Sequence, residues 1–534
     1  MRSASWCGLA AVVLCAAAWA GDYPQWRGPA RNGIVADSPA LATTWPKAGP
    51  PRLWTTTTLP AGGDGGFGCP AVVGEKVFVY ANVKYRVPIT PRKLSAQGLR
   101  RLGFYEPGPP AEILQAVEKA RVSQQRAKLK GKELNAWIKT WTNEHLKSDD
   151  DRKKFSRFVA DRLNRGAKAM SLELLDKLAT IKDKEFADQT ALDKWFADNG
   201  IDKDKDKDLI KTIARVIPTY IQKAWDKVYG FSAADGETSW EYTQEGRPSG
   251  WSASSTPCVA DGRVYASGSA GNLYCLNAEN GEEVWKVKAA PSGGLIHSSP
   301  LVADGMVVVL ADDLVAMDAT TGEVRWRQKR VRGRDNSPVL WKRPGTTFVI
   351  SNTGKDVACV NLKTGDVAWT VLGGGQSSPT VAGDVLALVS ARKEIGLAAY
   401  KMSADKAEKL WAKGDYRDGS TCPIVHDGYV YAVVGRKIVC VKVASGELAW
   451  EQKAGSQGWC SPALADGKIF AIVGREIWVI APTPEKFNLL AKARLNPATY
   501  TSPAVSDGRM YIRLGKTLGC YDLRKGAAAA AAKP

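Results

Sequence analysis

Three polar residues that could take part in proton transfer share one position in the sequence, three residues before a proline. They are His297, Asp335 and Gln376. An imidazole beside a carboxylate can act as a general base, because the carboxylate fixes the ring tautomer. The sequence places no activated nucleophile beside this pair, and a histidine that only hydrogen-bonds a neighbour fits the pattern better. We therefore predict no catalytic residues.

The same position before other prolines extends this set to eight residues, which we call the rim residues. They are Phe67, Ser254, His297, Asp335, Gln376, Ser420, Trp459 and Tyr500. Their aromatic members follow one another in the repeat, as do their polar members, and Arg334 and Arg417 stand close to the polar side. Aromatic rings stack on apolar ligand faces while polar groups bond hydroxyls. We predict a carbohydrate- or peptide-binding site, the alternative being the lining of a wet channel.

Metal-binding patterns are weak. The chain has only three histidines, and its ten cysteines show no zinc spacing. The acidic run 202–208 resembles a calcium loop, but Lys207 and Ile213 stand where such a loop needs glycine and glutamate. We predict a solvated loop there, no metal site and no bound cofactor.

An internal repeat supplies the elements that must position the rim residues. Each copy carries Ser-Pro or a similar dipeptide, a short apolar run, Asp-Gly, two β-type runs, then Gly-Glu and Trp. The anchoring prolines are Pro70, Pro257, Pro300, Pro338, Pro379, Pro423, Pro462 and Pro503. From the second to the last their spacing averages about 41 residues, the period of a four-stranded propeller blade. Eight anchors predict an all-β, eight-bladed β-propeller with the rim residues at its channel mouth.

Two copies depart from the repeat. The last copy ends after its third strand, and we expect residues 52–55 to supply the missing outer strand and close the ring. The first copy is interrupted between its second strand, 77–80, and its third strand, 228–231. The intervening residues 86–226 show helical periodicity and predict an inserted all-α subdomain of about five helices.

This repeat resembles that of the pyrroloquinoline-quinone (PQQ) propeller family, which includes quinoprotein alcohol dehydrogenases and BamB-like assembly factors. The resemblance rests on the Asp-Gly, Gly-Glu and Trp spacing, clearest in residues 256–285. The opening motifs Pro-Gln-Trp-Arg-Gly-Pro and Arg-Asn-Gly, within 24–33, also resemble exported members of planctomycete type. The helical insertion lies outside the resemblance.

The family's quinone chemistry implies calcium held by Glu, Asn and Asp ligands, an Asp base and, in many members, a disulfide of adjacent cysteines. This sequence has no adjacent cysteines, and the mouth offers one Asn/Asp pair, Asp335 and Asn336. We therefore favour a non-catalytic binding or scaffold protein. The alternative is a PQQ- and calcium-dependent quinoprotein oxidoreductase of alcohols or sugars.

Eight of the ten cysteines lie beyond the N-terminal leader described next. Those at 275, 359, 440 and 520 occupy third-strand positions and are predicted to pack in the blade cores. Cys69, Cys422 and Cys460 lie beside anchoring prolines, where either a disulfide or a free thiol is compatible with the sequence.

The N-terminus predicts export. Arg2, an apolar run over 8–18 and Ala-Trp-Ala ending at Ala20 form a signal peptide over 1–20. We expect a periplasmic or secreted protein with no membrane span and no lipid anchor. Its predicted parts are 21–85, with the closing strand and the start of the first blade; 86–226, the helical insertion; 227–525, the remaining propeller; and 526–534, a disordered Ala-rich tail.

The charge distribution and the predicted export restrict the classes of partner that we expect. The insertion is more basic than the rest of the chain, and Arg152, Lys153, Lys154 and Arg157 could meet an anionic surface, the alternative being a solvated helical face. Export argues against nucleic acid. We expect a monomer that binds an envelope protein or a glycan.

Overall fold

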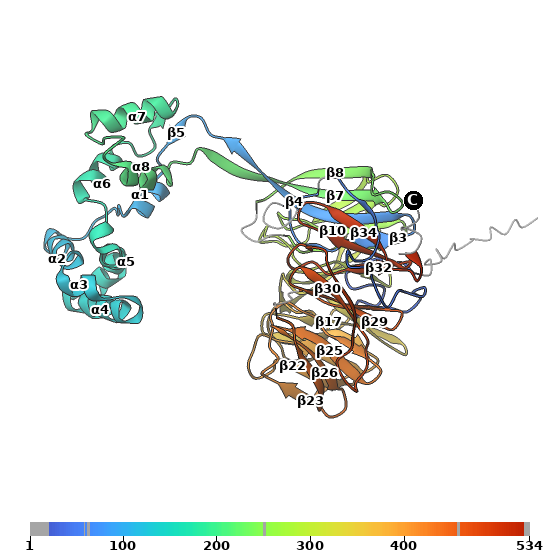
Figure 1. Ribbon diagram of the computed structural model, residues 1–534. Coiled ribbons are helices and arrows are strands. Elements are labelled where there is room, and N and C mark those ends of the chain that lie inside the picture. The colour runs from blue at the N-terminus through green and yellow to red at the C-terminus, as the bar shows by residue number, and fades with distance from the viewer. Residues whose placement is uncertain (1–20, 58, 61–64, 249–252, 456–459, 528–534) are drawn as a thin grey trace, which may run out of the picture. The chain divides into compact units, whose positions relative to one another are not determined.

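The computed structural model describes residues 21–527 except 58, 61–64, 249–252 and 456–459. The predicted signal peptide, the rim residue Trp459 and most of the predicted C-terminal tail lie outside the described residues. The chain divides into a strand unit, formed by residues up to 85 and from 223 onwards, and a helical unit, residues 86–222. Figure 1 shows the strands and helices of the two units.

Among its described residues the strand unit contains eight sheets, one after each anchoring proline, which we number as blades 1 to 8. Blade 1 has β3 (Ala71–Val73), β4 (Lys76–Pro88), β7 (Tyr220–Ser232) and β8 (Thr238–Gly246). Blade 2 has β9 (Cys258–Ala260), β10 (Arg263–Ser267), β11 (Asn272–Asn277) and β12 (Glu283–Lys288). Blade 3 has β13 (Leu301–Ala303), β14 (Met306–Asp318) and β15 (Val324–Gly333). Blade 4 has β16 (Val339–Arg343), β17 (Thr346–Asn352), β18 (Asp356–Asn361) and β19 (Val367–Leu372).

The second half of the strand unit follows the same order. Blade 5 has β20 (Thr380–Ala382), β21 (Val385–Val389), β22 (Leu397–Met402) and β23 (Ala407–Lys413). Blade 6 has β24 (Ile424–His426), β25 (Tyr429–Val434), β26 (Lys437–Lys442) and β27 (Leu448–Lys453). Blade 7 has β28 (Ala463–Ala465), β29 (Lys468–Val473), β30 (Glu476–Ile480) and β31 (Leu489–Arg494), with β1 (Ile34–Val35) beside β28. Blade 8 has β32 (Ala504–Ser506), β33 (Arg509–Arg513), β34 (Leu518–Asp522) and β2 (Arg52–Thr55).

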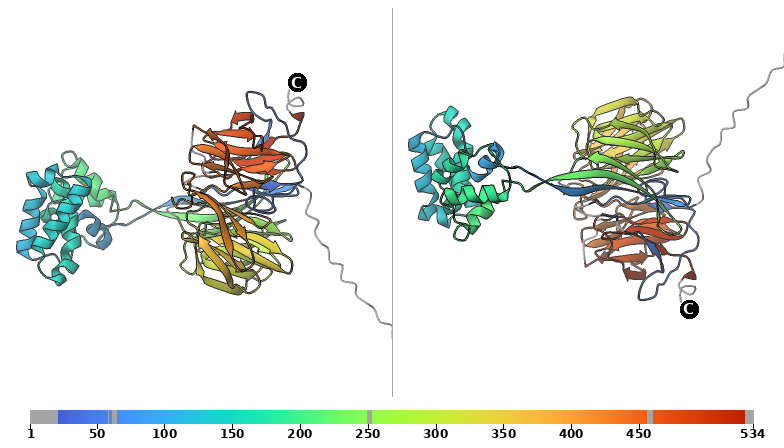
Figure 2. Two further views of the ribbon diagram at one scale, coloured as in Figure 1. Left: turned by 90° about the horizontal axis from the view of Figure 1, so that it is seen from below. Right: turned by 90° about the horizontal axis from the view of Figure 1, so that it is seen from above.

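The sheets close into a ring, which confirms the predicted β-propeller. The innermost strand of blade 1, β3, contacts β9 of blade 2 on one side and β32 of blade 8 on the other. The two middle strands of a blade, such as β10 and β11, are buried on both faces because each blade packs between two others. Figure 2 shows the blades from two further sides.

Tight turns and tryptophans explain why the repeat forms blades. At Asp261 and Gly262 the backbone φ angles are 48° and 70°, as a two-residue hairpin turn between β9 and β10 requires. The tryptophans that end the repeats lie on outer strands and pack between blades. Trp240 of blade 1, for example, is 8% exposed and donates from Nε1 to Ala278 O of blade 2 at 3.1 Å. Equivalent bonds of 2.7–3.2 Å are made by Trp285, Trp326, Trp369, Trp411 and Trp450.

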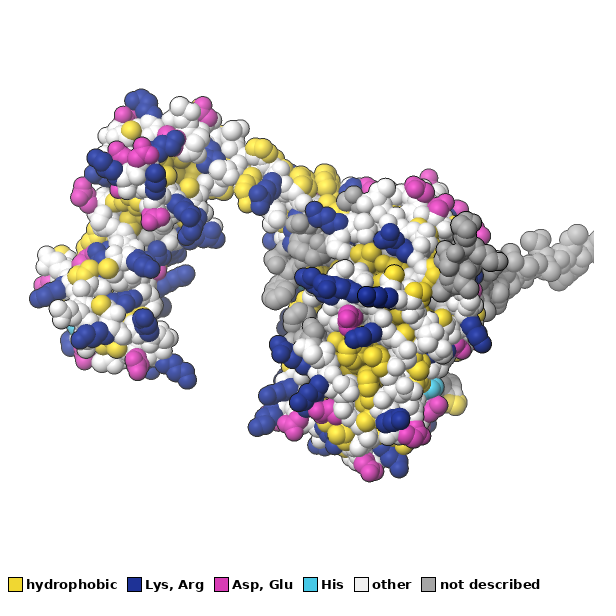
Figure 3. All heavy atoms as spheres, viewed as in Figure 1, with side chains coloured by type: hydrophobic (Ala, Val, Ile, Leu, Met, Phe, Trp, Pro, Cys, Tyr) yellow, Lys and Arg dark blue, Asp and Glu magenta, His cyan; other side chains and the backbone are white. Residues whose placement is uncertain are grey.

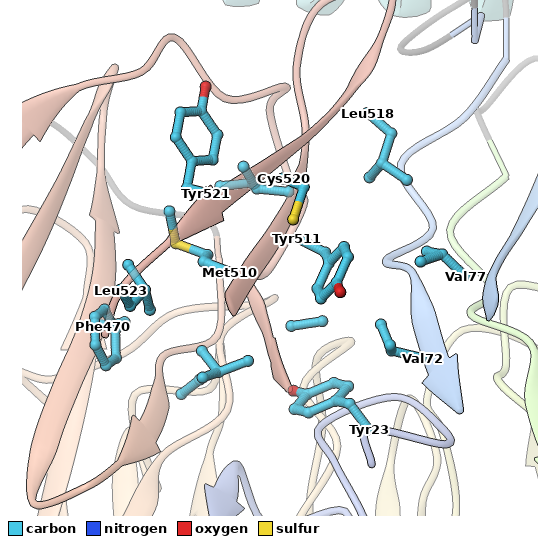
Figure 4. Packing of buried hydrophobic residues seen from close by; sticks show 14 of the residues in the cluster. Tyr23, Val72, Val77, Phe470, Met510, Tyr511, Leu518, Cys520, Tyr521 and Leu523 are labelled. Carbon is cyan, nitrogen blue, oxygen red and sulfur yellow. The ribbon is translucent and has the colours of Figure 1, made fainter. Parts of the chain in front are cut away.

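The N-terminal strand supplies the outer strand of the last blade, as the truncated final repeat predicted. β2 pairs antiparallel with β34, with Trp54 opposite Cys520. Trp54 donates from Nε1 to Ala233 O of blade 1 at 3.0 Å. It thus joins blade 8 to blade 1 by the same kind of hydrogen bond that the other tryptophans make between consecutive blades. Buried side chains of blades 1, 7 and 8 pack together here, including Tyr511 and Val72 (Figure 4). The closure therefore leaves no open edge between blade 8 and blade 1.

The helical unit consists of short helices and one two-stranded sheet. Its elements are β5 (Arg92–Lys93), α1 (Ala96–Leu102), α2 (Ala111–Arg121), α3 (Gln124–Lys128), α4 (Gly131–His145), α5 (Asp149–Arg165), α6 (Leu172–Ala179), β6 (Glu185–Phe186), α7 (Gln189–Asp198) and α8 (Lys207–Ala214). The prediction of about five helices was too low, because helices as short as α3 hold too few turns to show a period. Serine side chains cap several helix starts, and two separate apolar clusters form the interior.

The chain enters and leaves the helical unit through two neighbouring strands of blade 1, β4 and β7. The rings of Tyr85 and Trp225 stack on these strands with centroids 5.4 Å apart. The unit ends at residue 222, slightly before the predicted 226, because Asp226 belongs to the blade core. Its fully buried carboxylate accepts hydrogen bonds from Tyr80 and Tyr274 hydroxyls at 2.7 and 2.8 Å.

Candidate functional site

The N-terminal segment runs across the centre of the ring, beneath the channel mouth. Tyr23 exchanges backbone hydrogen bonds with Val72 of blade 1, and Pro24 O accepts from Val259 N of blade 2. Ten residues later, β1 lies parallel to β28 of blade 7. The segment therefore contacts blades on several sides of the ring and closes the channel from below.

Two buried arginines fix this segment. Arg31 donates to Pro300 O at 2.7 Å and to Ser299 O at 3.0 Å, while Arg27 donates to Thr380 Oγ1 at 2.7 Å. Burial lowers the pKa of Arg31 to about 10, so its guanidinium stays charged at neutral pH. Both guanidinium groups also lie against the ring of Trp26, at 5.6 and 5.7 Å from its centroid. Trp26 in turn lines the cavity above.

Above this floor, a belt of hydrogen bonds joins the blades. Each residue directly before an anchoring proline carries a hydroxyl or a thiol, and in all of them except Cys422 this group accepts from the backbone N–H of the equivalent residue in the preceding blade. Seven such bonds, of 2.8–3.1 Å, are found among the described residues. The members are Cys69, Thr256, Ser299, Ser337, Ser378, Cys422, Ser461 and Ser502. This belt explains the recurring Ser-Pro dipeptide, because the hydroxyl satisfies a buried N–H of its neighbour.

The belt closes between blades 8 and 1 through a sulfur atom. Ser502 N donates to Cys69 Sγ at 3.1 Å. Burial raises the pKa of the Cys69 thiol, so the sulfur stays protonated at neutral pH. All eight described cysteines are buried, and of the two alternatives for Cys69 and Cys422 the structure has the free thiol.

The rim residues meet at the mouth above the belt. Seven of them line one cavity of about 430 Å³ together with Trp26 and members of the belt, while Trp459 lies outside the described residues. The seven are Phe67, Ser254, His297, Asp335, Gln376, Ser420 and Tyr500. A volume of this size holds a small ligand or the protruding group of a larger one. Ligand binding by these residues stays a prediction.

The cavity has an aromatic side and a polar side. Phe67 and Tyr500 come from blades 1 and 8, and their ring centroids lie 5.1 Å apart. On the other side, His297 Nδ1 lies 3.2 Å from Ser254 Oγ. Asp335 is exposed at the rim beyond it, and it is the only carboxylate among the described residues that line the cavity.

The histidine is held as a neutral group. Burial lowers the pKa of His297, the nearby charge of Asp335 opposes this, and Arg334 adds to it. In the described structure no hydrogen bond joins His297 to Asp335, so the carboxylate does not orient the ring as a general-base pair needs. Ser254 beside the imidazole is a contact that the sequence did not reveal, because the two residues lie on different blades.

The two arginines predicted near the polar side of the site, Arg334 and Arg417, differ in their contacts. Arg334 forms an ion pair with Asp312 at 3.3 Å, and its backbone carbonyl accepts from His297 N at 2.9 Å. Arg417 is exposed and next to Asp418, whose carboxylate accepts from Ser420 N at 2.9 Å. Neither arginine is among the residues that line the cavity.

The donor set of the cavity does not fit the calcium and quinone site of the family's dehydrogenases. Such a site needs several carboxylate and amide oxygens, whereas the described lining offers hydroxyls, thiols, an imidazole, one amide and one carboxylate. The side chain of Asn336 is buried and donates to Ser377 O at 2.9 Å and to Gly375 O at 3.3 Å. Its amide is thus used to join two blades.

In the part of the chain that the structure describes, no helix has the length and apolar character needed to cross a membrane.

Comparison with known proteins points to one group of propellers. The model of the family described as outer membrane protein assembly factor BamB matches residues 224–371 and 405–483. BamB of Yersinia pestis is 26% identical over 239 residues, which cover 42% of this chain and 56% of that protein. The chain thus spans about half the length of the curated relatives it matches.

Two solved structures are also similar to parts of this chain. BamB from Moraxella catarrhalis has a TM-score of 0.44 and 18% identity, covering 55% of this chain and 88% of that chain. Quinohemoprotein alcohol dehydrogenase from Comamonas testosteroni has a TM-score of 0.43 and 13% identity, covering 57% of this chain and 73% of that chain.

Proposed function

Because this chain carries a PQQ-repeat propeller of the BamB-like family, we propose that it is an exported, non-catalytic binding protein that holds a protein partner in the cell envelope. The site is the cavity at the channel mouth. A protruding group of the partner enters it between the aromatic pair and the polar side. Export to the periplasm or beyond, which is expected from the predicted signal peptide, is part of the proposal.

The observation that carries this proposal is that the cavity is closed at its base. Trp26 forms the floor, and the buried guanidinium groups of Arg27 and Arg31 lie against its ring. A ligand therefore enters and leaves by the same mouth, as suits a binding pocket that receives one group. The side chains that differ between blades are gathered at the rim, above a belt of nearly uniform hydroxyl and thiol groups, so the rim is where the repeat has been adapted for recognition.

The family model and several of the matched relatives are described as outer membrane protein assembly factors, which supports a role of this kind, although another matched relative is named as a tetrathionate hydrolase. A glycan is the second candidate ligand. It is favoured by the Phe67 and Tyr500 rings, because sugars stack their apolar faces on aromatics while their hydroxyls bond groups such as Gln376.

Capture from an envelope extract tests this function. The mature chain, immobilised through its C-terminus, is compared with a Phe67→Ala variant and with a chain in which residues 86–222 are replaced by a short Gly-containing turn. The two units have separate apolar clusters and β4 neighbours β7, so the shortened chain should stay folded. We expect the shortened chain to retain the partner and Phe67→Ala to lose it. Retention by Phe67→Ala, with loss on removing the helical unit, would contradict the proposal.

The alternative, a quinoprotein oxidoreductase, makes a different prediction. Reconstitution with PQQ and calcium would give quinone absorbance and dye-linked oxidation of alcohols or sugars. Asp335→Asn would abolish that turnover, because Asp335 is the only carboxylate among the described lining residues. Our account expects no turnover above the protein-free control, and Asp335-dependent dye reduction would establish the enzyme.

A further inference from the structure

A second hollow lies entirely within the helical unit and is lined by arginines. It has a volume of about 660 Å³ between the end of α1, the loop that follows and the last turns of α5. Its charged lining residues are Arg100, Arg101, Arg157, Asp161 and Arg165. Four guanidinium groups thus face one carboxylate. In the one face that Figure 3 shows, Lys and Arg side chains are frequent on the helical unit.

Only one of these arginines is neutralised. Arg165 donates from Nε to Asp161 Oδ1 at 2.9 Å and from Nη2 to Arg101 O at 2.8 Å. This pair ties α5 to the end of α1 and holds the wall of the hollow in place. Among the described residues, no carboxylate lies within ion-pair distance of Arg100, Arg101 or Arg157. The hollow therefore keeps about three uncompensated positive charges.

An aromatic side chain, Tyr105, lies beside one of the free arginines in the lining of the hollow. The guanidinium of Arg100 lies 5.5 Å from the centroid of Tyr105, whose ring packs edge-on against Phe158 with centroids 5.5 Å apart. The charges of Arg157, Arg100 and Arg165 all act on the Tyr105 hydroxyl. Burial nevertheless raises the pKa of Tyr105, with Asp161 adding to the rise, so the phenol keeps its proton and can donate a hydrogen bond.

We propose that this hollow, formed by Arg100, Arg101, Arg157 and Tyr105, is a binding site for a phosphomonoester group. Arginine presents planar pairs of N–H donors that match phosphate oxygens. A phosphomonoester carries close to two negative charges and three terminal oxygens, so it can be contacted by several guanidinium groups at once. A carboxylate has one charge and two oxygens and would leave part of the positive charge uncompensated. The site is independent of the propeller cavity and of the function proposed for it.

The phosphate could be carried by a soluble molecule such as a sugar phosphate or by a lipid headgroup, and two assays separate these sources. In the first, inorganic phosphate, glucose 6-phosphate and acetate are titrated into the full mature chain at low salt by calorimetry. In the second, the chain is sedimented with phosphatidylcholine vesicles with and without phosphatidic acid. Binding in the first assay alone identifies a soluble phosphate, and binding to phosphatidic acid vesicles identifies a lipid source.

Variants distinguish the site from general basic charge. Arg100→Gln with Arg157→Gln removes two free guanidinium groups, and Lys132→Gln with Lys139→Gln removes the same charge from exposed positions of α4 that do not line the hollow. Circular dichroism of both variants checks the fold. We expect the arginine pair to weaken phosphate binding by roughly tenfold or more and the lysine pair to leave it nearly unchanged. Equal losses in both variants, equal affinity for acetate and phosphate, or no binding in either assay would overturn the proposal.

Discussion

Phe67 and Tyr500 come from the first and last blades, yet their rings lie 5.1 Å apart with a tilt of 58° at the mouth of the channel. Tyr500 is 39% exposed and has a backbone φ of 64°, a left-handed conformation that side chains rarely adopt. Strained residues of this kind are typical of functional sites. Substitution of Phe67 or Tyr500 is therefore the most informative test of whether the cavity binds a ligand.

Tyr500→Gly separates recognition from stability. Glycine adopts positive φ without strain, so we expect the free energy of unfolding to stay within about 1 kcal/mol of the wild-type value. Loss of an aromatic anchor should weaken partner binding by roughly tenfold or more. Urea unfolding and binding measurements on the same preparation check both. Phe67→Ala, which removes the other ring, serves as the comparison, and unchanged binding in both variants would contradict the role of the pair.

The closure of the ring can be tested at one side chain. Trp54→Phe removes the hydrogen bond from Nε1 to Ala233 O and should cost about 1 kcal/mol, while Trp54→Ala also opens a cavity and should cost about 3–5 kcal/mol. Trp285→Phe removes the equivalent bond between blades 2 and 3 and is the matched control. Removing residues 21–58 should destabilise the whole propeller. A truncated chain that melts at the wild-type temperature would show that closure by β2 is dispensable.

The hydrogen-bond belt predicts opposite outcomes for two substitutions of one cysteine. Cys69→Ala leaves the buried Ser502 N–H without its acceptor and should cost about 1–3 kcal/mol, whereas Cys69→Ser supplies the hydroxyl that most other blades have and should cost little. Cys359→Ala, which changes packing in blade 4, controls for the loss of a sulfur atom. Urea unfolding of the three variants measures the change in the free energy of unfolding that each substitution causes. If Cys69→Ser were as destabilising as Cys69→Ala, the belt would not explain the dipeptide.

The buried histidine makes stability depend on pH. Burial lowers the pKa of His297 below its value of about 6.5 in the unfolded chain, so on acidification the unfolded state takes up the proton first. The free energy of unfolding should therefore fall as the pH drops below about 6.5. We expect His297→Gln to make this dependence shallower, because the variant has no imidazole to protonate at this position. Identical pH profiles for wild type and His297→Gln would contradict a buried neutral imidazole.

The repeat predicted the propeller and the position of the rim residues, because its prolines, Asp-Gly pairs and tryptophans recur at a fixed spacing that is visible in the sequence. The Ser254 and His297 contact could not be predicted, since it joins two blades whose relative rotation no local pattern specifies. Trp26 was visible in its motif, but its place on the cavity floor depends on the path of the N-terminal segment. The recurring Ser-Pro dipeptide was a sequence signal for the hydrogen-bond belt. Comparison of the residue before each anchoring proline with the equivalent residue of the next repeat would have revealed the belt.

Recognition at the channel mouth can be measured by site-specific photo-crosslinking in cells. Benzoylphenylalanine is introduced at Gln376, which is exposed and lines the cavity, and separately at Val284, which is exposed on the outer strand of blade 2. Our account predicts a discrete crosslinked partner or glycoconjugate from position 376, lost in the Tyr500→Gly background, and no such product from position 284. A product formed only from position 284, or one from 376 that persists without the tyrosine ring, would contradict it.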